Sequence, residues 1–281
     1  MPSNPKKGLN DWHTNLWLDQ HLESGDMAKR TGRSVDASPH AHETHVANVA
    51  EKFVVITVPR MVANVPNDFV ADYVARFPGR AIGLACVDPN DPGAPAEFER
   101  AITKRGMRGL KLGPVYQNFD PWSREAWRLY EMANTFRVPI LWHQASAFPA
   151  QGVFEYANPG LLDKVARAFP EMKMILAHLG TPWMAETVQL LRKHKQLYSD
   201  LSARFYRKWE LYNGLMLAID YKVTGQLLFG SDFPMQSTRD AADSFRELVK
   251  FAEDTSLPRI GNDVIDDILY NRPLELIWPT I

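Results

Sequence analysis

Short apolar runs alternate with longer amphipathic segments along nearly the whole chain. Eight such runs lie at residues 9–13, 52–58, 81–87, 109–113, 138–143, 172–178, 196–202 and 225–232. Most are apolar throughout instead of at every second residue, which is typical of strands buried on both faces of a parallel sheet. Parallel strands need long connections, and the amphipathic segments between the runs are long enough for helices. The alternation therefore predicts repeated strand–helix units.

Helical periodicity fills most of the gaps between these runs. The helical segments lie at residues 68–77, 95–104, 123–136, 159–169, 183–194 and 240–251. Eight strands alternating with helices predict an α/β fold, a single (β/α)₈ TIM barrel over residues 1–281, with a doubly wound parallel sheet as the alternative. A length of 281 residues is ordinary for one such barrel, and we expect no second domain. The long segment at residues 17–40 follows the first strand, where barrels carry functional loops.

Composition narrows the classes of function. The formal net charge of −1 argues against a nucleic-acid-binding protein, which usually carries a basic excess. No apolar run approaches the ~20 residues needed to span a membrane, and the first residues lack the apolar stretch of a secretion signal. The single cysteine, Cys86, lies inside an apolar run, where we expect it to pack in the core. Because it cannot form an internal disulfide, we expect a cytoplasmic location.

Polar residues end four of the eight apolar runs. His13 ends the first run, His143 the fifth, His178 the sixth and Asp232 the eighth. In a barrel, the carboxyl ends of the strands meet at one mouth, so these four side chains are predicted to converge. Imidazole and carboxylate suit borderline cations such as zinc, manganese or iron. The pattern therefore predicts a metal site at the mouth of the barrel.

Four motifs around these residues resemble signatures of the amidohydrolase superfamily. They are DWH at residues 11–13, PILWHQAS at 139–146, MILAHLG at 174–180 and LLFGSDFP at 227–234. The chain is more narrowly similar to the amidohydrolase-related branch, which includes aminocarboxymuconate-semialdehyde decarboxylase, resorcylate decarboxylase and pyrone-dicarboxylate lactonase. The segments GLKLGPVYQNFDP (109–121) and DILYNRPLELIW (267–278) also match this branch in position and character.

The resemblance implies roles for the four strand-end residues. His13, His143 and Asp232 would bind one divalent ion, zinc or manganese, and Asp232 would also accept a proton. His178 would face the substrate as an acid/base group, as the strand-six histidine does in the decarboxylases of the branch.

The first motif departs from the His-x-His pair of other members. Here it reads His13-Thr14-Asn15, and an amide oxygen is a weak ligand for zinc compared with imidazole. Alternation along a strand places His13 and Asn15 on one face and Thr14 on the other. We therefore expect Asn15 to lie near the metal or its water as a hydrogen-bonding group. The alternative is that metal binding is weakened or lost.

Several further residues are candidates for binding the substrate. Arg60 follows the second run and Arg204 follows the seventh. Each would either bind a substrate carboxylate through two parallel hydrogen bonds or form an ion pair at the surface. Tyr116 follows the fourth run and is a candidate pocket residue. Lys111 lies where some superfamily members place a strand-four lysine. In the polar segment SPHAHETH (38–45), the histidines are expected to belong to a solvated helix start.

The sequence favours a metal-dependent enzyme that decarboxylates a small unsaturated or aromatic carboxylic acid. A metal-dependent hydrolase of a lactone or amide is the alternative, because the same four residues would serve it. A catalytically inactive binding barrel is the second alternative. The expected partner is a small-molecule carboxylate or lactone substrate. A homodimer is a candidate for the oligomeric state.

Overall fold

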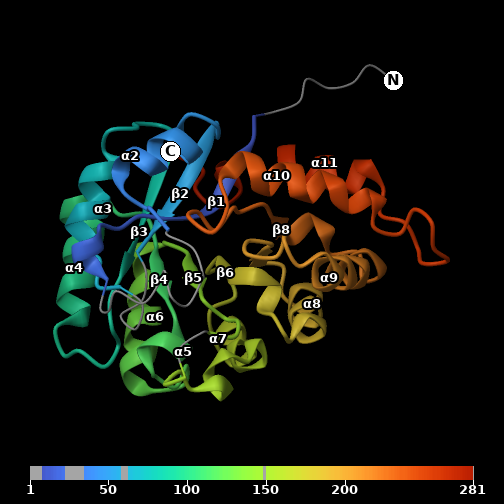
Figure 1. Ribbon diagram of the computed structural model, residues 1–281. Helices are drawn as coiled ribbons and strands as arrows, with labels where there is room; N and C mark the ends of the chain where they lie inside the picture. Colours follow the sequence, from blue (N-terminus) through green and yellow to red (C-terminus); the bar gives the residue numbers. More distant parts are fainter. Residues whose placement is uncertain (1–7, 23–34, 58–62, 148–149, 281) are drawn as a thin grey trace.

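Eight parallel strands form one sheet in chain order in the computed structural model (Figure 1). The structure describes residues 8–22, 35–57, 63–147 and 150–280. The strands are β1 (Asn10–Asn15), β2 (Lys52–Ile56), β3 (Ala81–Cys86), β4 (Leu110–Leu112), β5 (Ile140–Trp142), β6 (Met174–Leu176), β7 (Leu197–Asp200) and β8 (Leu227–Leu228). Each falls within or overlaps one of the eight predicted runs.

Backbone hydrogen bonds between the first and last strands close the sheet into a barrel. The amide of Trp12 donates to the carbonyl of Phe229, and the amide of Asn15 donates to the carbonyl of Phe233, each at 2.9 Å. The amide of Asp232 donates to the carbonyl of His13 at the same distance. A doubly wound sheet would leave both outer strands unpaired, so the predicted (β/α)₈ barrel is confirmed and the doubly wound alternative is wrong.

Helices surround the barrel and connect its strands (Figure 1). They are α2 (Pro39–His42), α3 (Asn67–Val74), α4 (Ala94–Arg105), α5 (Pro114–Gln117), α6 (Arg124–Phe136), α7 (Leu162–Ala168), α8 (Met184–Lys193), α9 (Lys208–Asp220), α10 (Thr238–Arg246) and α11 (Asn262–Tyr270). Short turns of 3₁₀ or π helix are η1 (Asp19–His21), η2 (Glu43–Ala47), η3 (Phe154–Ala157), η4 (Pro159–Leu161), η5 (Ala177–Gly180), η6 (Thr224–Gln226), η7 (Glu247–Lys250) and η8 (Leu274–Leu276). The six predicted helical segments correspond to α3, α4, α6, α7, α8 and α10.

Two apolar layers hold the barrel. The larger lies between the strands and the surrounding helices, and the smaller fills the barrel interior. In the smaller layer Trp12 stacks on Trp278 with ring centroids 5.8 Å apart, and the indole of Trp278 donates to the carbonyl of Arg108 just before β4. The amino-terminal end of the barrel is therefore packed with apolar side chains, which leaves polar chemistry to the carboxyl end.

Some predictions fall on residues that the structure does not describe. Half of the predicted loop at residues 17–40 lies in the undescribed range 23–34, and Arg60 lies in the range 58–62. Within the described ranges, the helices are all too short or too polar to cross a lipid bilayer.

Candidate active site at the carboxyl ends of the strands

Three imidazole rings and one carboxylate meet where β1, β5, β6 and β8 end. The ring centroids of His13 and His178 lie 5.0 Å apart, and those of His143 and His178 lie 4.8 Å apart. Nδ1 of His143 is 3.2 Å from Nε2 of His178, and Nε2 of His13 is 3.4 Å from Oδ1 of Asp232. The structure thus brings together the four residues that the sequence had placed at strand ends.

Asp232 is held in an unusual backbone conformation at the end of β8. Its φ angle is 56°, in the left-handed region that L-residues seldom occupy, although aspartate tolerates it better than most. Its amide is fixed by the carbonyl of His13. Burial raises the pKa of the Asp232 carboxyl, while His13 and a hydrogen bond from Asn15 act in the opposite direction. The strained backbone aims the carboxylate into the cluster.

Asn15 binds Asp232 directly. Its Nδ2 donates to Oδ1 of Asp232 at 3.0 Å and to the carbonyl of Phe233 at 2.9 Å. Thr14 points the other way, where its hydroxyl donates to the carbonyl of Val54 at 2.7 Å. The alternation expected along β1 is therefore present from residue 13 to residue 15. Both amide hydrogens of Asn15 are used to orient the end of β8.

Asp200 at the end of β7 belongs to the cluster and was missed in the sequence. Its fully buried carboxylate accepts from Nδ1 of His13 at 2.9 Å, and from the backbone amides of His178 and Ser202 at 3.1 Å each. Burial alone would raise the pKa of Asp200, but His13 and a hydrogen bond from the Ser202 hydroxyl hold it below its usual value. The available signal was weaker than for His13, because Asp200 lies two residues before the end of the seventh run at residue 202.

The imidazoles of His143 and His178 are neutral in this environment. Burial lowers the pKa of each well below the usual histidine value, and the nearby charge of Lys111 lowers the pKa of His143 further. Nδ1 of His178 lies 2.8 Å from the hydroxyl of Ser202, and the residue has a left-handed φ of 60°. A neutral imidazole can accept a proton or bind a cation, so both rings are available for chemistry.

The structure brings together one set of possible metal ligands, which shares His13 with the predicted set. Within the described residues, His13, His178 and Asp200 offer ligand atoms that all lie within 4.8 Å of one another. The sequence had predicted His13, His143 and Asp232. Asp200 already accepts from Nδ1 of His13 and from backbone amides, whereas Nε2 of His13 faces Asp232. Imidazole nitrogen and carboxylate oxygen suit zinc or manganese in both sets.

Two of the predicted substrate-binding residues border the cluster. Tyr116 on α5 is buried, and its ring centroid lies 4.5 Å from that of His143. Arg204 follows β7, and its charge acts on His178 and Tyr116. Nη1 of Arg204 also donates to Glu210 at 2.9 Å, so this residue is an ion-pair partner as well as a neighbour of the site.

The expectation of solvated histidines in residues 38–45 is wrong for His42. This residue is fully buried, and its ring nitrogens lie 2.9 Å from the hydroxyls of Thr14 and Tyr73. Burial lowers the pKa of His42 to about 3. His40 and His45 are exposed, as expected. The error has a physical reason: the partners of His42 come from β1 and α3, far from it in the sequence.

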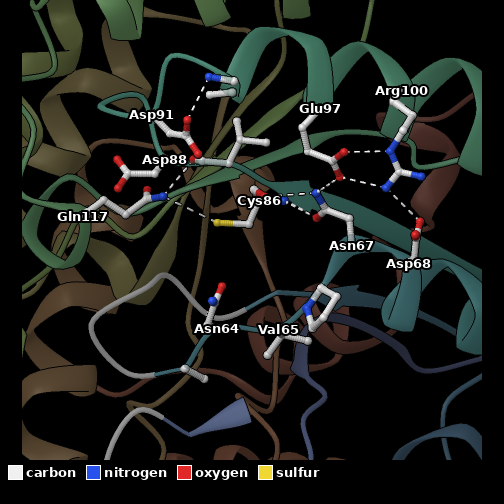
Figure 2. A pocket seen from close by; sticks show the side chains of 15 residues that line it. Asn64, Val65, Asn67, Asp68, Cys86, Asp88, Asp91, Glu97, Arg100 and Gln117 are labelled. Atoms are coloured by element: carbon white, nitrogen blue, oxygen red, sulfur yellow. Dashed lines mark hydrogen bonds and ion pairs between the residues drawn. The ribbon is translucent and has the colours of Figure 1, made fainter.

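A cavity of about 600 Å³ lies beside the barrel mouth, between the segments that follow β2 and β3 (Figure 2). Asn67, Glu97, Cys86 and Gln117 are among its lining residues, and the four strand-end residues of the site are not. Nε2 of Gln117 is 3.7 Å from the thiol of Cys86, and burial raises the pKa of that thiol to about 11. Cys86 thus lines a cavity instead of packing fully in the core, and its thiol is protonated at neutral pH.

Comparisons with known proteins agree with this architecture. A gamma-resorcylate decarboxylase from Polaromonas sp. strain JS666 is 23% identical over 233 residues, which cover 64% of this chain and 68% of the relative. A dihydroxybenzoic acid decarboxylase structure from the same organism, with bound manganese and the inhibitor 2-nitroresorcinol, superposes with a TM-score of 0.64 at 19% identity and covers 94% of this chain and 95% of its own. A probable 2-pyrone-4,6-dicarboxylic acid hydrolase from Acinetobacter baumannii, with citric acid bound, has a TM-score of 0.69 at 14% identity and coverages of 97% and 99%. The amidohydrolase family model matches residues 10–271, and the chain therefore belongs to the amidohydrolase family.

Proposed function

We propose that this protein decarboxylates a small unsaturated or aromatic carboxylic acid with the help of one divalent metal ion, zinc or manganese. The observation that carries the proposal is the convergence of His13, His143, His178 and Asp232 at one end of the barrel. The relative that acts on resorcylate supports this choice of reaction over hydrolysis.

Three residues of the cluster would hold the metal. Nε2 of His13 and Oδ1 of Asp232 face each other. His143 is the third residue, and its ring contacts that of His178. Asp200 would stand behind His13, where its hydrogen bond fixes the tautomer and the direction of the ring. When bound, the ion would supply a Lewis acid that polarises an oxygen of the substrate.

The remaining chemistry is proton transfer by side chains of this chain. In such a decarboxylation, a proton is added to the carbon that carries the carboxylate. The bond between the two carbons then breaks, its electron pair stays with the ring or alkene, and carbon dioxide leaves. Asp232, whose pKa is raised by burial, and the neutral His178 are placed to hold and pass that proton. Asn15, Tyr116 and Arg204 would then border the substrate.

The test is a screen of metal-loaded protein with 2,6-dihydroxybenzoate, muconate derivatives and lactones. Release of carbon dioxide is the expected result, and Asp232→Ala should reduce its rate by ~10²–10⁴-fold, as loss of a general acid–base group does. His194→Gln is the matched control, because this buried histidine binds Asp163 at 2.8 Å just before β7, at the opposite end of the barrel.

The other outcomes of the screen are equally informative. Formation of acid without release of gas would replace the proposed reaction with hydrolysis. Absence of both reactions, together with no metal in elemental analysis, would favour a binding barrel.

We also propose that the protein acts in a reducing compartment such as the cytoplasm. The single cysteine of the chain supports this location, because it cannot form an internal disulfide.

A further inference from the structure

A buried lysine points into the barrel beneath the imidazole cluster. Lys111 is the middle residue of β4, where it pairs with Cys86 of β3 and Leu141 of β5. Its neighbours Leu110 and Leu112 belong to the outer apolar layer, and successive residues of a strand point to opposite faces. The side chain of Lys111 therefore points inward, where it is only 1% exposed.

The position of Lys111 places its ammonium at the floor of the candidate site. Its register partner on β5 is Leu141, and His143 follows two residues later toward the carboxyl end. Residues two apart in a strand share a face, so Lys111 belongs to the layer just below His143. The charge of Lys111 also acts on His143, Asp200 and Asp232. The ammonium thus lies within the electrostatic field of the cluster.

The Lys111 ammonium has no hydrogen-bond acceptor in the part of the chain that the structure describes. A buried ammonium without an acceptor lowers the stability of the fold, because it has lost its hydrogen bonds to water and forms none with the protein. Asp200 and Asp232 attract it electrostatically without bonding to it. Burial lowers the pKa of Lys111 to about 8, so the group remains mostly protonated at neutral pH. Its three N–H donors are therefore available to an anion that enters the site.

Arg204 is less available than Lys111 to bind an anion that enters the site. Its guanidinium already donates to Glu210 at 2.9 Å, and that carboxylate would compete with a substrate for it. Lys111 carries no such ion pair with a described residue. Of these two cations near the cluster, the buried lysine is the one whose charge lacks a bonded counter-ion.

We propose that the Lys111 ammonium binds the carboxylate of the substrate at the floor of the barrel. The proposal rests on the decarboxylation proposed above, since that reaction requires a carboxylic acid. The contact forms when the substrate binds, persists while the carbon is protonated, and ends only when carbon dioxide leaves. With protonation as the slow step, it stabilises the bound substrate and the transition state alike, so it contributes to substrate affinity and leaves kcat little changed, which makes Lys111 a substrate-binding residue.

Lys111→Met tests this role, because methionine keeps an unbranched chain and removes the charge. Metal-loaded wild type and variant are titrated with 2,6-dihydroxybenzoate, benzoate and muconate, and with resorcinol, which lacks the carboxylate. We expect the variant to bind the carboxylates ~10- to 100-fold more weakly and resorcinol with unchanged affinity, since only a charge-assisted hydrogen bond is removed. In turnover, KM should rise by the same factor while kcat stays within about 3-fold.

Controls separate a binding role from a structural one. Lys173→Met removes a lysine just before β6, at the amino-terminal end, where its ammonium lies over the ring of Tyr198, and should leave carboxylate binding unchanged. Lys111→Gln provides a second variant in case the first folds poorly. The thermal stability of Lys111→Met should equal or exceed that of the wild type, because a buried charge without an acceptor has been removed.

Several results would overturn the proposal. They are equal carboxylate affinity in wild type and Lys111→Met, a loss of resorcinol binding as large as that of the carboxylates, or a wild type that binds none of the carboxylates. A carbamate on Lys111, detected by NMR with isotopically labelled bicarbonate, would also overturn it, because the side chain would then be an anion. Carboxylate binding that depends on Lys111 without release of carbon dioxide would instead refute only the proposed decarboxylation.

Discussion

At the scale of single residues, Asn15 shows how an amide side chain can orient a proposed metal ligand. Its side-chain amide donates two hydrogen bonds to residues that follow β8, one to the Asp232 carboxylate and one to the Phe233 carbonyl. These bonds fix the direction of the carboxylate and favour its charged form. Where the family resemblance implies a second imidazole, this chain therefore holds a donor that orients a neighbouring group.

Asn15→Ala should slow turnover while metal remains bound. Removing the donor frees the Asp232 carboxylate to rotate, and losses of this kind typically cost ~10- to 100-fold in activity or metal affinity. Steady-state kinetics with elemental analysis of the same samples checks the prediction. Asn15→His, which restores an imidazole, should tighten metal binding. Full activity and unchanged metal affinity in Asn15→Ala would show that the hydrogen bond to Asp232 contributes neither to turnover nor to metal binding.

The residues also show what the sequence could and could not predict. His13, His143, His178 and Asp232 were found because each ends an apolar run, and the barrel topology converts that position into proximity. Asp200 obeys the same rule, but it lies inside a run that continues to residue 202, so its terminal position was masked. The burial of His42 was beyond sequence reasoning, because its partners are supplied by tertiary packing.

At the scale of elements, the segment that follows β8 lies close against β1 at Gly230. A methyl group built on this residue would lie 2.7 Å from Cβ of His13 and 3.1 Å from its backbone nitrogen. It would also lie 3.3 Å from Cβ of Ser202. Contacts this short with strand backbone cannot be relieved by turning a flexible side chain. The absence of a side chain at Gly230 therefore determines how close His13 can lie to Asp232.

Gly230→Ala should displace His13 and lower both stability and activity. Overpacking of this kind typically costs ~1–3 kcal/mol, and a small displacement of a positioned group costs on the order of 10- to 100-fold in rate. Gly225 is the matched control, because a methyl group there would have no neighbour within 4 Å. Urea unfolding and turnover of both variants check the prediction. Equal behaviour of the two alanine variants would show that β1 and β8 adjust freely.

Most elements could be predicted from the sequence, but the helices α9 and α11 and the single turn α5 were missed. The strands were recognisable because burial on both faces makes their runs apolar throughout. Helix α9 was missed because apolar residues occur on most of its sides, so no amphipathic period stands out in KWELYNGLMLAID. Helix α11 is amphipathic and as long as α10, so the segment NDVIDDILY carried a helical signal that the sequence analysis did not use.

At the scale of the whole molecule, several histidines are buried in neutral form. Burial lowers the pKa of His42 to about 3 and lowers those of His143 and His178 well below the usual value. In the unfolded chain these rings take up protons near pH ~6.5. Between that pH and the lower folded pKa values, the unfolded state binds more protons than the folded state. Folding free energy is therefore lost as the pH falls.

We expect the metal-free protein to be most stable above pH ~6.5 and to lose stability steadily down to pH ~4, at ~1.4 kcal/mol per histidine for each pH unit. Urea unfolding at a series of pH values after chelation measures this slope. His42→Asn should reduce the slope, whereas His40→Gln, a change at an exposed position, should preserve it. A free energy of unfolding that stays constant between pH 7.5 and 5 would contradict the expectation.

The closure of β1 on β8 also affects how the protein is made. Asn15 and Asp232, which meet in one hydrogen bond, are 217 positions apart in the chain. A nascent chain therefore carries its first strand as an unpaired edge until the eighth has been synthesised, and such edges are prone to aggregation. Contacts of this long range also make folding slow. Because the proposed metal ligands His13 and Asp232 come from opposite ends of the chain, ion binding would select completed barrels from folding intermediates and shift the equilibrium toward them.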